Sequence, residues 1–484
     1  MMIKPKNKSH KFCKQNDSIE SGVKAPLVEA LENFYKNPMM QFHIPGHTGG
    51  HGAYQPFKKL VGDRALSLDT TDEFDNLGTL HPATGPIKEA QGLAAAAFGA
   101  QRTFYLLGGS TLGNLTLAMC MSKRGNKVIV NRNCHRSILT GMIISGAEPI
   151  WILPEKLKEW SLWGEIEPQE IEKALKENDD IAMVWITNPT YEGVVTDVKK
   201  ISDICKKYDV PLVVDEAHGC LWNFNKNFPT SSLHLGADAV VHSLHKTGGS
   251  MAQSSLLHIT KDSKFDPDEI ERTLQLLQTT SPSMLLMASL DAARANLESK
   301  RGKRQLKRAI QYASFVRNKL HKMENVHVLE ATEHFDRDIT KIFVKVDGLS
   351  GKRLESILEI DFKIEVESAS DIGVLLLINI GNTKEEIQYL LNAFEKISKA
   401  NYSDIYYIEN RKHMPMVTPR IVMNPRKAYY QEKETILKED AIGRVSAEVI
   451  AECPPGISVL LPGELITEEH LPYLNEYKYL EVIK

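Results

Sequence analysis

Short runs of apolar, often β-branched residues alternate with helix-forming segments through the middle of this 484-residue chain. The run Ile181–Thr187 is continuously apolar, as expected for a strand that is buried on both faces of a parallel sheet. Shorter runs of the same kind stand at 103–107, 127–131, 211–214 and 238–243. Strands and helices that alternate in this way predict a doubly wound α/β domain with a mostly parallel sheet.

Each predicted strand ends in polar residues that can carry chemistry. Ligands of open α/β sheets bind beyond the carboxyl ends of the strands, so these side chains are expected to line one site. Two glycines precede Ser110 and Thr111 at a predicted helix start, where free N–H groups and the helix dipole favour a phosphate. The same hydroxyls could instead serve only as an N-cap. The side chains expected at this edge are Ser110, Thr111, His135, Asp215, His218, Ser243, His245 and Lys246.

Lys246 follows the predicted strand 238–243 and is the candidate nucleophile. A lysine in this position usually points to water, but a partly desolvated amine could form a Schiff base with a carbonyl. Asp215, in the preceding βα unit, favours the second interpretation. A pyridinium nitrogen needs a carboxylate partner, an aldehyde needs a lysine, and a phosphate needs the glycine-hydroxyl helix start. The three together predict a pyridoxal 5′-phosphate site.

A series of motifs runs in order over roughly residues 40 to 465 of the chain. They include Pro45-Gly-His47, Gly109-Ser-Thr111, Asn188-Pro-Thr-Tyr191, Val214-Asp-Glu-Ala-His-Gly219, Ser243-Leu-His-Lys-Thr247, Thr279-Thr-Ser-Pro282 and Pro462-Gly-Glu464. In these motifs the sequence resembles the bacterial ornithine/lysine/arginine decarboxylases. The resemblance implies an α/β, fold-type-I pyridoxal-phosphate-dependent transferase-like fold. Such a fold has a mostly parallel seven-stranded sheet with helices on both faces, followed here by smaller C-terminal α/β units.

The resemblance also implies a role for each residue at the sheet edge. Lys246 is the Schiff-base lysine, Asp215 pairs with the pyridine nitrogen, and His245 or Lys246 returns a proton to Cα after carbon dioxide leaves. His135 stacks on the cofactor ring and His218 lies beside it. The residues implied to hold the phosphate are Ser110, Thr111, Ser243 and His245, with Thr280 reaching it from a neighbouring subunit.

The implied reaction is decarboxylation of a basic L-amino acid. Compact members of the family, which lack an N-terminal receiver-like domain, are often arginine decarboxylases, so arginine is the first expectation, with agmatine formed for polyamine biosynthesis. Lysine and ornithine are alternatives. Other chemistry on the same scaffold, such as transamination or aldol cleavage, and a non-catalytic regulatory relative are further alternatives.

The sequence predicts four parts of the chain. Residues 1–25 are expected to be a disordered tail, and 26–325 an N-terminal segment with the large cofactor-binding domain. Residues 326–400 are expected to form a small α/β domain, and 401–484 a connector and a C-terminal unit typical of the family.

Four further segments carry specific expectations. In the C-terminal unit, 442–452 is predicted to be helical and 454–464 a Pro/Gly-rich loop, where Glu464 is either a surface residue or a partner for a distal cationic group. The acidic stretch 69–76 is either a solvated loop or a receiver of a cationic substrate. Three histidines stand four residues apart in 43–51, but one proline and three glycines between them exclude a helix, so no metal site is expected.

The amino-acid composition limits the classes of binding partner and the cellular compartment that we expect for this protein. The net charge is −3, and the basic segment 300–304 lacks interleaved aromatic residues, so a solvated helix start is expected there rather than a nucleic-acid site. The six cysteines form no CxxC pair, and no apolar run reaches membrane-spanning length. We therefore expect a cytoplasmic protein that binds neither nucleic acid nor a membrane. The family resemblance implies a small basic amino acid as its ligand. The family resemblance further implies a homodimer or larger homo-oligomer with shared active sites.

Overall fold

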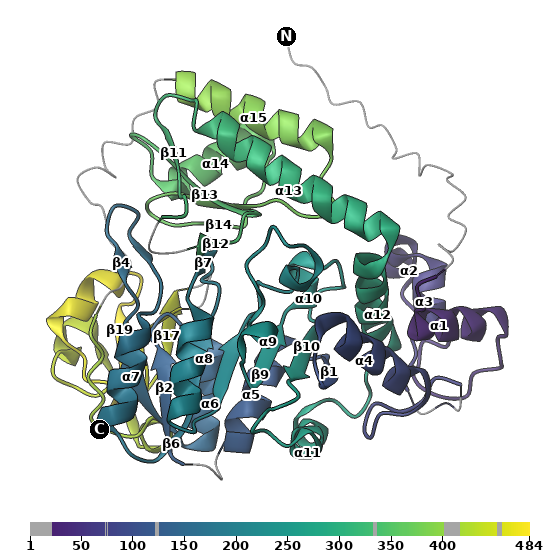
Figure 1. Cartoon of the computed structure of the whole chain (residues 1–484), viewed down its shortest axis with the longest axis horizontal. Helices are drawn as coiled ribbons and strands as arrows, with labels where there is room; N and C mark the ends of the chain where they lie inside the picture. Colours follow the sequence, from purple (N-terminus) through teal and green to yellow (C-terminus); the bar gives the residue numbers. More distant parts are fainter. Residues whose placement is uncertain are drawn as a thin grey trace.

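The computed structural model describes residues 22–484 except 73, 75, 122–124, 333–335, 401–416 and 453–456. Most of the predicted tail 1–25 and of the predicted connector 401–419 therefore lies outside the described residues. Figure 1 shows a large sheet flanked by helices, a smaller sheet with its own helices above it, and the C-terminal strands, in yellow, at one side.

The central sheet has seven strands in the order β1-β10-β9-β8-β6-β2-β3. β10 runs antiparallel to both of its neighbours, and every other neighbouring pair is parallel. The prediction of a mostly parallel seven-stranded sheet is confirmed. In spatial order the strands are β1 (Arg102–Leu106), β10 (Ser255–Ile259), β9 (Ala239–His242), β8 (Leu212–Asp215), β6 (Ile181–Thr187), β2 (Lys127–Asn131) and β3 (Glu148–Ile152).

Successive strand residues point to opposite faces of the sheet, and each face has its own apolar core. On β2, Ile129 packs into one core, while Val128 and Val130 pack into the other. Helices therefore cover both faces, as predicted. One face packs against α4 (Gly85–Phe98), α7 (Pro168–Glu177), α8 (Val198–Lys207) and α12 (Met284–Glu298), with α1 (Pro26–Lys36) outside them. The other packs against α5 (Gly109–Cys120), α6 (Arg136–Ser145) and α11 (Pro267–Leu277).

A second, four-stranded antiparallel sheet follows, in the order β11-β13-β15-β14. The helix α13 joins the two sheets, since Leu306 packs in the large core and Val316 in the small one. A short pair of strands, β7 with β12, ties the small sheet to the large domain. The elements are β7 (Val194–Val195), α13 (Lys300–Leu320), β11 (Val326–Val328), β12 (Asp336–Arg337), β13 (Lys341–Val346), α14 (Gly351–Phe362), β14 (Ser368–Ala369), β15 (Val374–Leu377) and α15 (Lys384–Lys399).

The C-terminal unit consists of two strand pairs around a small apolar core. The prediction of a helix over 442–452 is wrong, because this segment is extended and ends in β17. β18 also lies inside the predicted loop 454–464, of which 454–456 are not described. The elements are α17 (Pro425–Tyr429), β16 (Lys433–Leu437), β17 (Ile450–Glu452), β18 (Ile457–Leu460) and β19 (Tyr479–Ile483).

Pairing with distant strands explains why 442–452 is not helical. Gly443 has a φ of 79°, which a helix does not accept, and the backbone of Val445 and Ser446 bridges Leu465 and Val482. These tertiary hydrogen bonds replace the local ones that a helix would make. Apolar spacing along the sequence does not reveal partners that stand 20 or more residues away.

Glu464 differs from both of the expectations for it, because it is completely buried and already paired. Its carboxylate accepts two hydrogen bonds from the Arg132 guanidinium, at 2.6 and 3.0 Å, and a third from the backbone N–H of Leu461 at 3.0 Å. Arg132 follows β2, so this ion pair fastens the C-terminal unit to the large domain. Glu464 is neither a surface residue nor available to a substrate.

We expect Glu464→Gln to destabilise the docking of the C-terminal unit by about 3–5 kcal/mol, because Arg132 would remain as an uncompensated buried charge. Hydrogen exchange of the β17–β18 amides measures this change directly. Glu468→Gln, at an exposed position of the same unit, is the matched control and should leave protection unchanged. Equal protection in both variants would show that the ion pair does not hold the unit.

Candidate active site

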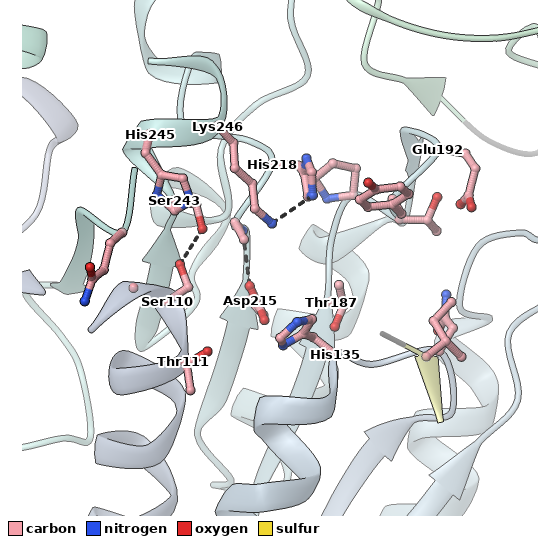
Figure 2. Close-up of a pocket in the computed structure, with 18 residues that line it drawn as sticks. Ser110, Thr111, His135, Thr187, Glu192, Asp215, His218, Ser243, His245 and Lys246 are labelled. Carbon is pink, nitrogen blue, oxygen red and sulfur yellow. Dashed lines mark hydrogen bonds between the residues drawn. The ribbon is translucent and has the colours of Figure 1, made fainter. Parts of the chain in front are cut away.

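A cavity of about 260 Å³ lies beyond the carboxyl ends of the central strands (Figure 2). Of the nine site residues predicted from the sequence, eight line it. The exception is Thr280, which is exposed on the segment between α11 and α12 and outside the cavity. The eight are Ser110, Thr111, His135, Asp215, His218, Ser243, His245 and Lys246.

The start of α5 forms one side of this cavity. No side chain caps the helix, so the alternative in which Ser110 or Thr111 is an ordinary N-cap is wrong. The Ser110 and Ser243 hydroxyls are 2.6 Å apart, and Gly109 has a φ of 70°, which glycine adopts readily. Uncapped backbone N–H groups with two hydroxyls beside them make a polar cradle suited to a phosphate.

Asp215 stands at the end of β8 with only 3% of its surface exposed. Its Oδ2 accepts a hydrogen bond from the Asn114 amide at 2.9 Å, and its Oδ1 accepts one from the N–H of Ala217 at 3.2 Å. These contacts hold the carboxylate at the cavity wall. Asn114 was not predicted from the sequence, although it stands one helical turn after Ser110 and so on the same face of α5.

His135 is connected to Asp215 through two intervening side chains. The Asn114 amide also donates to the hydroxyl of Ser137 at 2.8 Å, and that hydroxyl lies 2.8 Å from Nδ1 of His135. The backbone N–H of Ser137 donates to the same Nδ1, which makes His135 the N-cap of α6. Nδ1 is therefore an acceptor and Nε2 carries the ring proton. Burial lowers the pKa of His135, so the ring is favoured as neutral.

Lys246 lies in α10 (Leu244–Thr247), immediately after β9. Its Nζ is 2.9 Å from Nε2 of His218, as Figure 2 shows, and burial lowers its pKa from the ordinary lysine value. Asp215 opposes part of this shift. His245 donates from Nδ1 to the carbonyl of Ser254 at 2.8 Å, and burial lowers its pKa as well. The site therefore favours neutral, basic nitrogens over charged ones.

The loop after β6 and the small domain supply groups that the sequence did not assign. Glu192 lines the cavity at 8% exposure, and burial raises its pKa. Tyr191 donates from its hydroxyl to Glu367 of the small domain at 2.7 Å. Lys341, also from the small domain, places its Nζ within hydrogen-bond distance of Nδ1 of His218, on the side of the ring opposite Lys246. The loop after β6 is recognisable in the sequence as another polar segment at a strand end. Nothing near Lys341 in the sequence indicates that it lies at the site, because it opens a strand about 100 residues away from Lys246.

The described residues of two other segments do not line the cavity. In the acidic stretch, Asp69 lies 3.1 Å from His47, and Asp72 is buried and accepts a hydrogen bond from the N–H of Leu80 at 2.8 Å. Residues 73 and 75 of that stretch are not described. The 43–51 segment forms turns instead of a helix, and in the described part of the chain no group of three or more His, Cys, Asp or Glu side chains is arranged to bind a metal.

A hydroxyl-lined helix start, a buried carboxylate and a desolvated lysine thus surround one cavity at the edge of a mostly parallel sheet. The three groups fit the phosphate, the ring nitrogen and the aldehyde of pyridoxal phosphate. The fold and the cavity define the class as fold type I of the pyridoxal-phosphate-dependent enzymes.

Comparison with known proteins narrows this class to one family. Profiles of the Orn/Lys/Arg decarboxylase major domain and C-terminal domain match residues 25–345 and 408–484, and the chain belongs to this family. It is 37% identical over 465 residues to an arginine decarboxylase of Bacillus anthracis (94% of this chain, 93% of the relative). It is 36% identical over 457 residues to that of Bacillus subtilis (93% and 92%).

Among solved structures, the fold is similar to that of the Francisella novicida lysine decarboxylase LdcF. The TM-score is 0.85 at 20% sequence identity, over 96% of this chain and 81% of that one. The family and the enzymes that share its fold depend on pyridoxal phosphate. No helix in the described ranges is both long and apolar enough to cross a membrane.

Proposed function

We propose that this protein binds pyridoxal 5′-phosphate and decarboxylates a basic L-amino acid, most readily arginine, to agmatine and carbon dioxide. The observation that carries the proposal is the convergence of Lys246, Asp215 and the uncapped α5 start on one cavity. Lys246 would hold the cofactor through its aldehyde carbon, Asp215 would pair with the ring nitrogen, and His135 would pack on the ring.

The cofactor, when bound, supplies an electron sink for the pair left on Cα as the carboxylate departs. The side chains of the protein position the reacting groups and supply protons. Asn114 and the Ala217 N–H hold the Asp215 carboxylate at the cavity wall, because both donate hydrogen bonds to it. His245 and Lys246 are the candidates for returning a proton to Cα, and both are desolvated nitrogens in the cavity wall.

Two observations support a basic substrate. The arginine decarboxylases of two Bacillus species share 36–37% of the aligned residues over nearly the whole chain. Within the cavity, Glu192 is a buried carboxylate whose pKa burial raises, so a cationic side chain beside it would stabilise its charged form. The first supports arginine in particular, while the second is equally compatible with lysine and ornithine.

Product analysis with arginine, lysine and ornithine tests the proposal. We expect carbon dioxide and the amine in equal amounts, fastest from arginine, with no keto acid. Release of a keto acid would indicate transamination instead. Absence of any product from all three amino acids, in protein that binds the cofactor, would favour the non-catalytic alternative.

Ser243→Ala is expected to weaken binding of the cofactor by roughly 10- to 100-fold, because one hydrogen bond to a charged group contributes about 1.5–3 kcal/mol. Titration of the cofactor-free protein with pyridoxal phosphate, followed by its absorbance, measures the change. Ser314→Ala is the control, since the Ser314 hydroxyl bonds only to a carbonyl of its own helix. Unchanged affinity in Ser243→Ala would place the phosphate elsewhere.

We also propose that the protein forms at least a homodimer and resides in the cytoplasm. Met39, Met40 and Phe42 expose 70%, 90% and 96% of their surface, which is typical of a contact face. Thr280 is exposed, as expected for a residue that completes the site of a neighbouring subunit. Four described cysteines are thiols and not disulfides, which supports a reducing compartment. Sedimentation analysis of the purified protein tests the dimer, and a monomer with full activity would contradict it.

A further inference from the structure

Lys341 is a second lysine beside the site, and it lies on the opposite side of His218 from Lys246. It opens β13 of the small sheet and is 1% exposed. Its Nζ donates to the carbonyl of Tyr191 at 2.6 Å and lies 3.0 Å from Nδ1 of His218. Since Lys246 lies 2.9 Å from Nε2 of the same ring, the three side chains form one continuous hydrogen-bonded chain.

The surroundings of Lys341 hold this arrangement in place. Gly193 has a φ of 99°, and a Cβ there would lie 2.9 Å from the Cβ of Lys341, so the absence of a side chain gives the lysine stem its space. The Tyr191 ring meets His218 edge-on, with centroids 5.1 Å apart. β7 follows directly after the loop that carries Tyr191 and Gly193. Because β7 pairs with β12, this loop is fixed against the segment of the small domain that leads into Lys341.

Lys246 and Lys341 cannot both be ammonium groups while both are hydrogen-bonded to His218. A neutral imidazole has one N–H and one acceptor nitrogen, so it accepts a hydrogen bond from one lysine only. A protonated imidazole donates from both nitrogens, which requires both amines to be neutral. In every arrangement that keeps both contacts, at least one of Lys246 and Lys341 is a neutral amine.

The hydrogen-bond partners of Lys341 favour the charge on that residue, because the Tyr191 carbonyl is an acceptor for its Nζ in addition to His218. Three carboxylates and one lysine face it, and the short contact to the Tyr191 carbonyl is typical of a charged donor. Full burial acts in the opposite direction and lowers the pKa of Lys341 to about 8, which still leaves it mostly protonated at neutral pH. The charged groups facing Lys341 are Asp338, Glu192, Glu367 and Lys246.

The titratable groups around Lys246 and His218 differ, and no carboxylate is among the described groups that shift the pKa of His218. The titratable groups that face Lys246 are Asp215, Glu367 and Cys220. Those that face His218 are the two lysines, His135 and His245. Burial holds the pKa of His218 well below its usual value, and the Lys341 ammonium group adds to this effect, so the ring is neutral and carries a single proton.

We propose that Lys341 is a positioning residue that sets the protonation of Lys246 through His218. Its ammonium group donates to Nδ1, which keeps the ring proton on Nε2, and Nε2–H donates to Lys246. Lys246 is thereby held as the neutral amine that can attack a carbonyl. This inference rests on the function proposed above for Lys246, but its test needs neither cofactor nor turnover.

The test is the pH dependence of Lys246 acetylation in the full-length chain without cofactor. Acetic anhydride reacts only with the neutral amine, and mass spectrometry of the peptide that contains Lys246 gives its titration midpoint. We expect Lys341→Met to raise that midpoint by at least about one pH unit, because Nδ1 can then hold the ring proton and Lys246 can donate as an ammonium. Lys341→Arg, which keeps a permanent cation, should restore much of the low midpoint.

A direct charge effect must be separated from an effect relayed by His218. Introduced together with His218→Phe, Lys341→Met should shift the Lys246 midpoint by less than half as much as it does alone. Lys345→Met is the matched control on the same strand, where the lysine pairs with Glu159, and it should shift nothing. An unchanged midpoint in Lys341→Met, or an equal shift without His218, would overturn the proposal.

Nitrogen NMR of the unmodified protein keeps the proposal testable if a variant does not fold. With ¹⁵N-labelled histidine, His218 is expected to be the neutral tautomer with its proton on Nε2. A proton on Nδ1 would overturn the proposal. If the tautomer and the midpoints are as expected but no amino acid is decarboxylated, the proposed function fails and the role of Lys341 stands.

Discussion

Lys246→Ala is expected to lower the rate of arginine decarboxylation by at least about a thousand-fold and to remove the visible absorbance of bound cofactor. Lys246 is the cavity-lining lysine at the strand end, and its desolvated Nζ is 2.9 Å from His218. Without this amine the cofactor aldehyde has no covalent partner in the protein. Steady-state assays of carbon dioxide release, together with absorbance spectra of the purified variant, measure both effects.

An exposed lysine provides the control for this substitution. Lys303→Ala, near the start of α13, should keep both activity and absorbance. Binding of the cofactor to Lys246→Ala with unchanged absorbance would contradict the assignment, because the Schiff base would then involve another lysine.

Asp215→Asn is expected to lower kcat by about 10²- to 10⁴-fold while the visible absorbance remains. The amide has nearly the same shape as the carboxylate but cannot balance a positive charge on the ring nitrogen, so the cofactor would withdraw electrons less strongly. Single-turnover decarboxylation of arginine, measured alongside the absorbance spectrum, separates this loss from loss of cofactor. The result would show that Asp215 acts on the reaction itself.

Asp203→Asn is the matched control, since Asp203 is exposed on α8 and pairs with Lys199 one turn away. It should leave kcat unchanged. Asp215→Asn with a normal kcat would contradict the pairing of Asp215 with the ring nitrogen. Loss of kcat only in proportion to lost cofactor would instead assign Asp215 a binding role alone.

The central domain could be predicted from the sequence because its signals are local. The run Ile181–Thr187 is buried on both faces and proved to be β6 with the same bounds, and Lys127–Asn131 proved to be β2. Parallel strands place their carboxyl ends at one edge, so eight predicted side chains from different strands meet around one cavity.

The features that sequence reasoning missed depend on contacts between distant parts of the chain. The segment 442–452 has apolar residues at helical spacing, but its hydrogen bonds go to strands near Leu465 and Val482. The burial of Glu464 could not be predicted, because its partner, Arg132, stands 332 residues earlier. Lys341 likewise becomes a candidate only when β13 is seen beside His218. The acidic stretch 69–76 could be noticed as a pattern, but its described carboxylates are used by His47 and by the N–H of Leu80.

Reduction with borohydride after addition of pyridoxal phosphate, followed by peptide mass spectrometry, tests the central claim most directly. One partly buried lysine, Lys246, and one buried lysine, Lys341, lie on either side of His218, and we assign the cofactor to Lys246. The predicted result is one pyridoxyl group per chain, on the peptide that contains Lys246. A pyridoxyl group on Lys341 or on any other lysine, or none at all, would contradict the account.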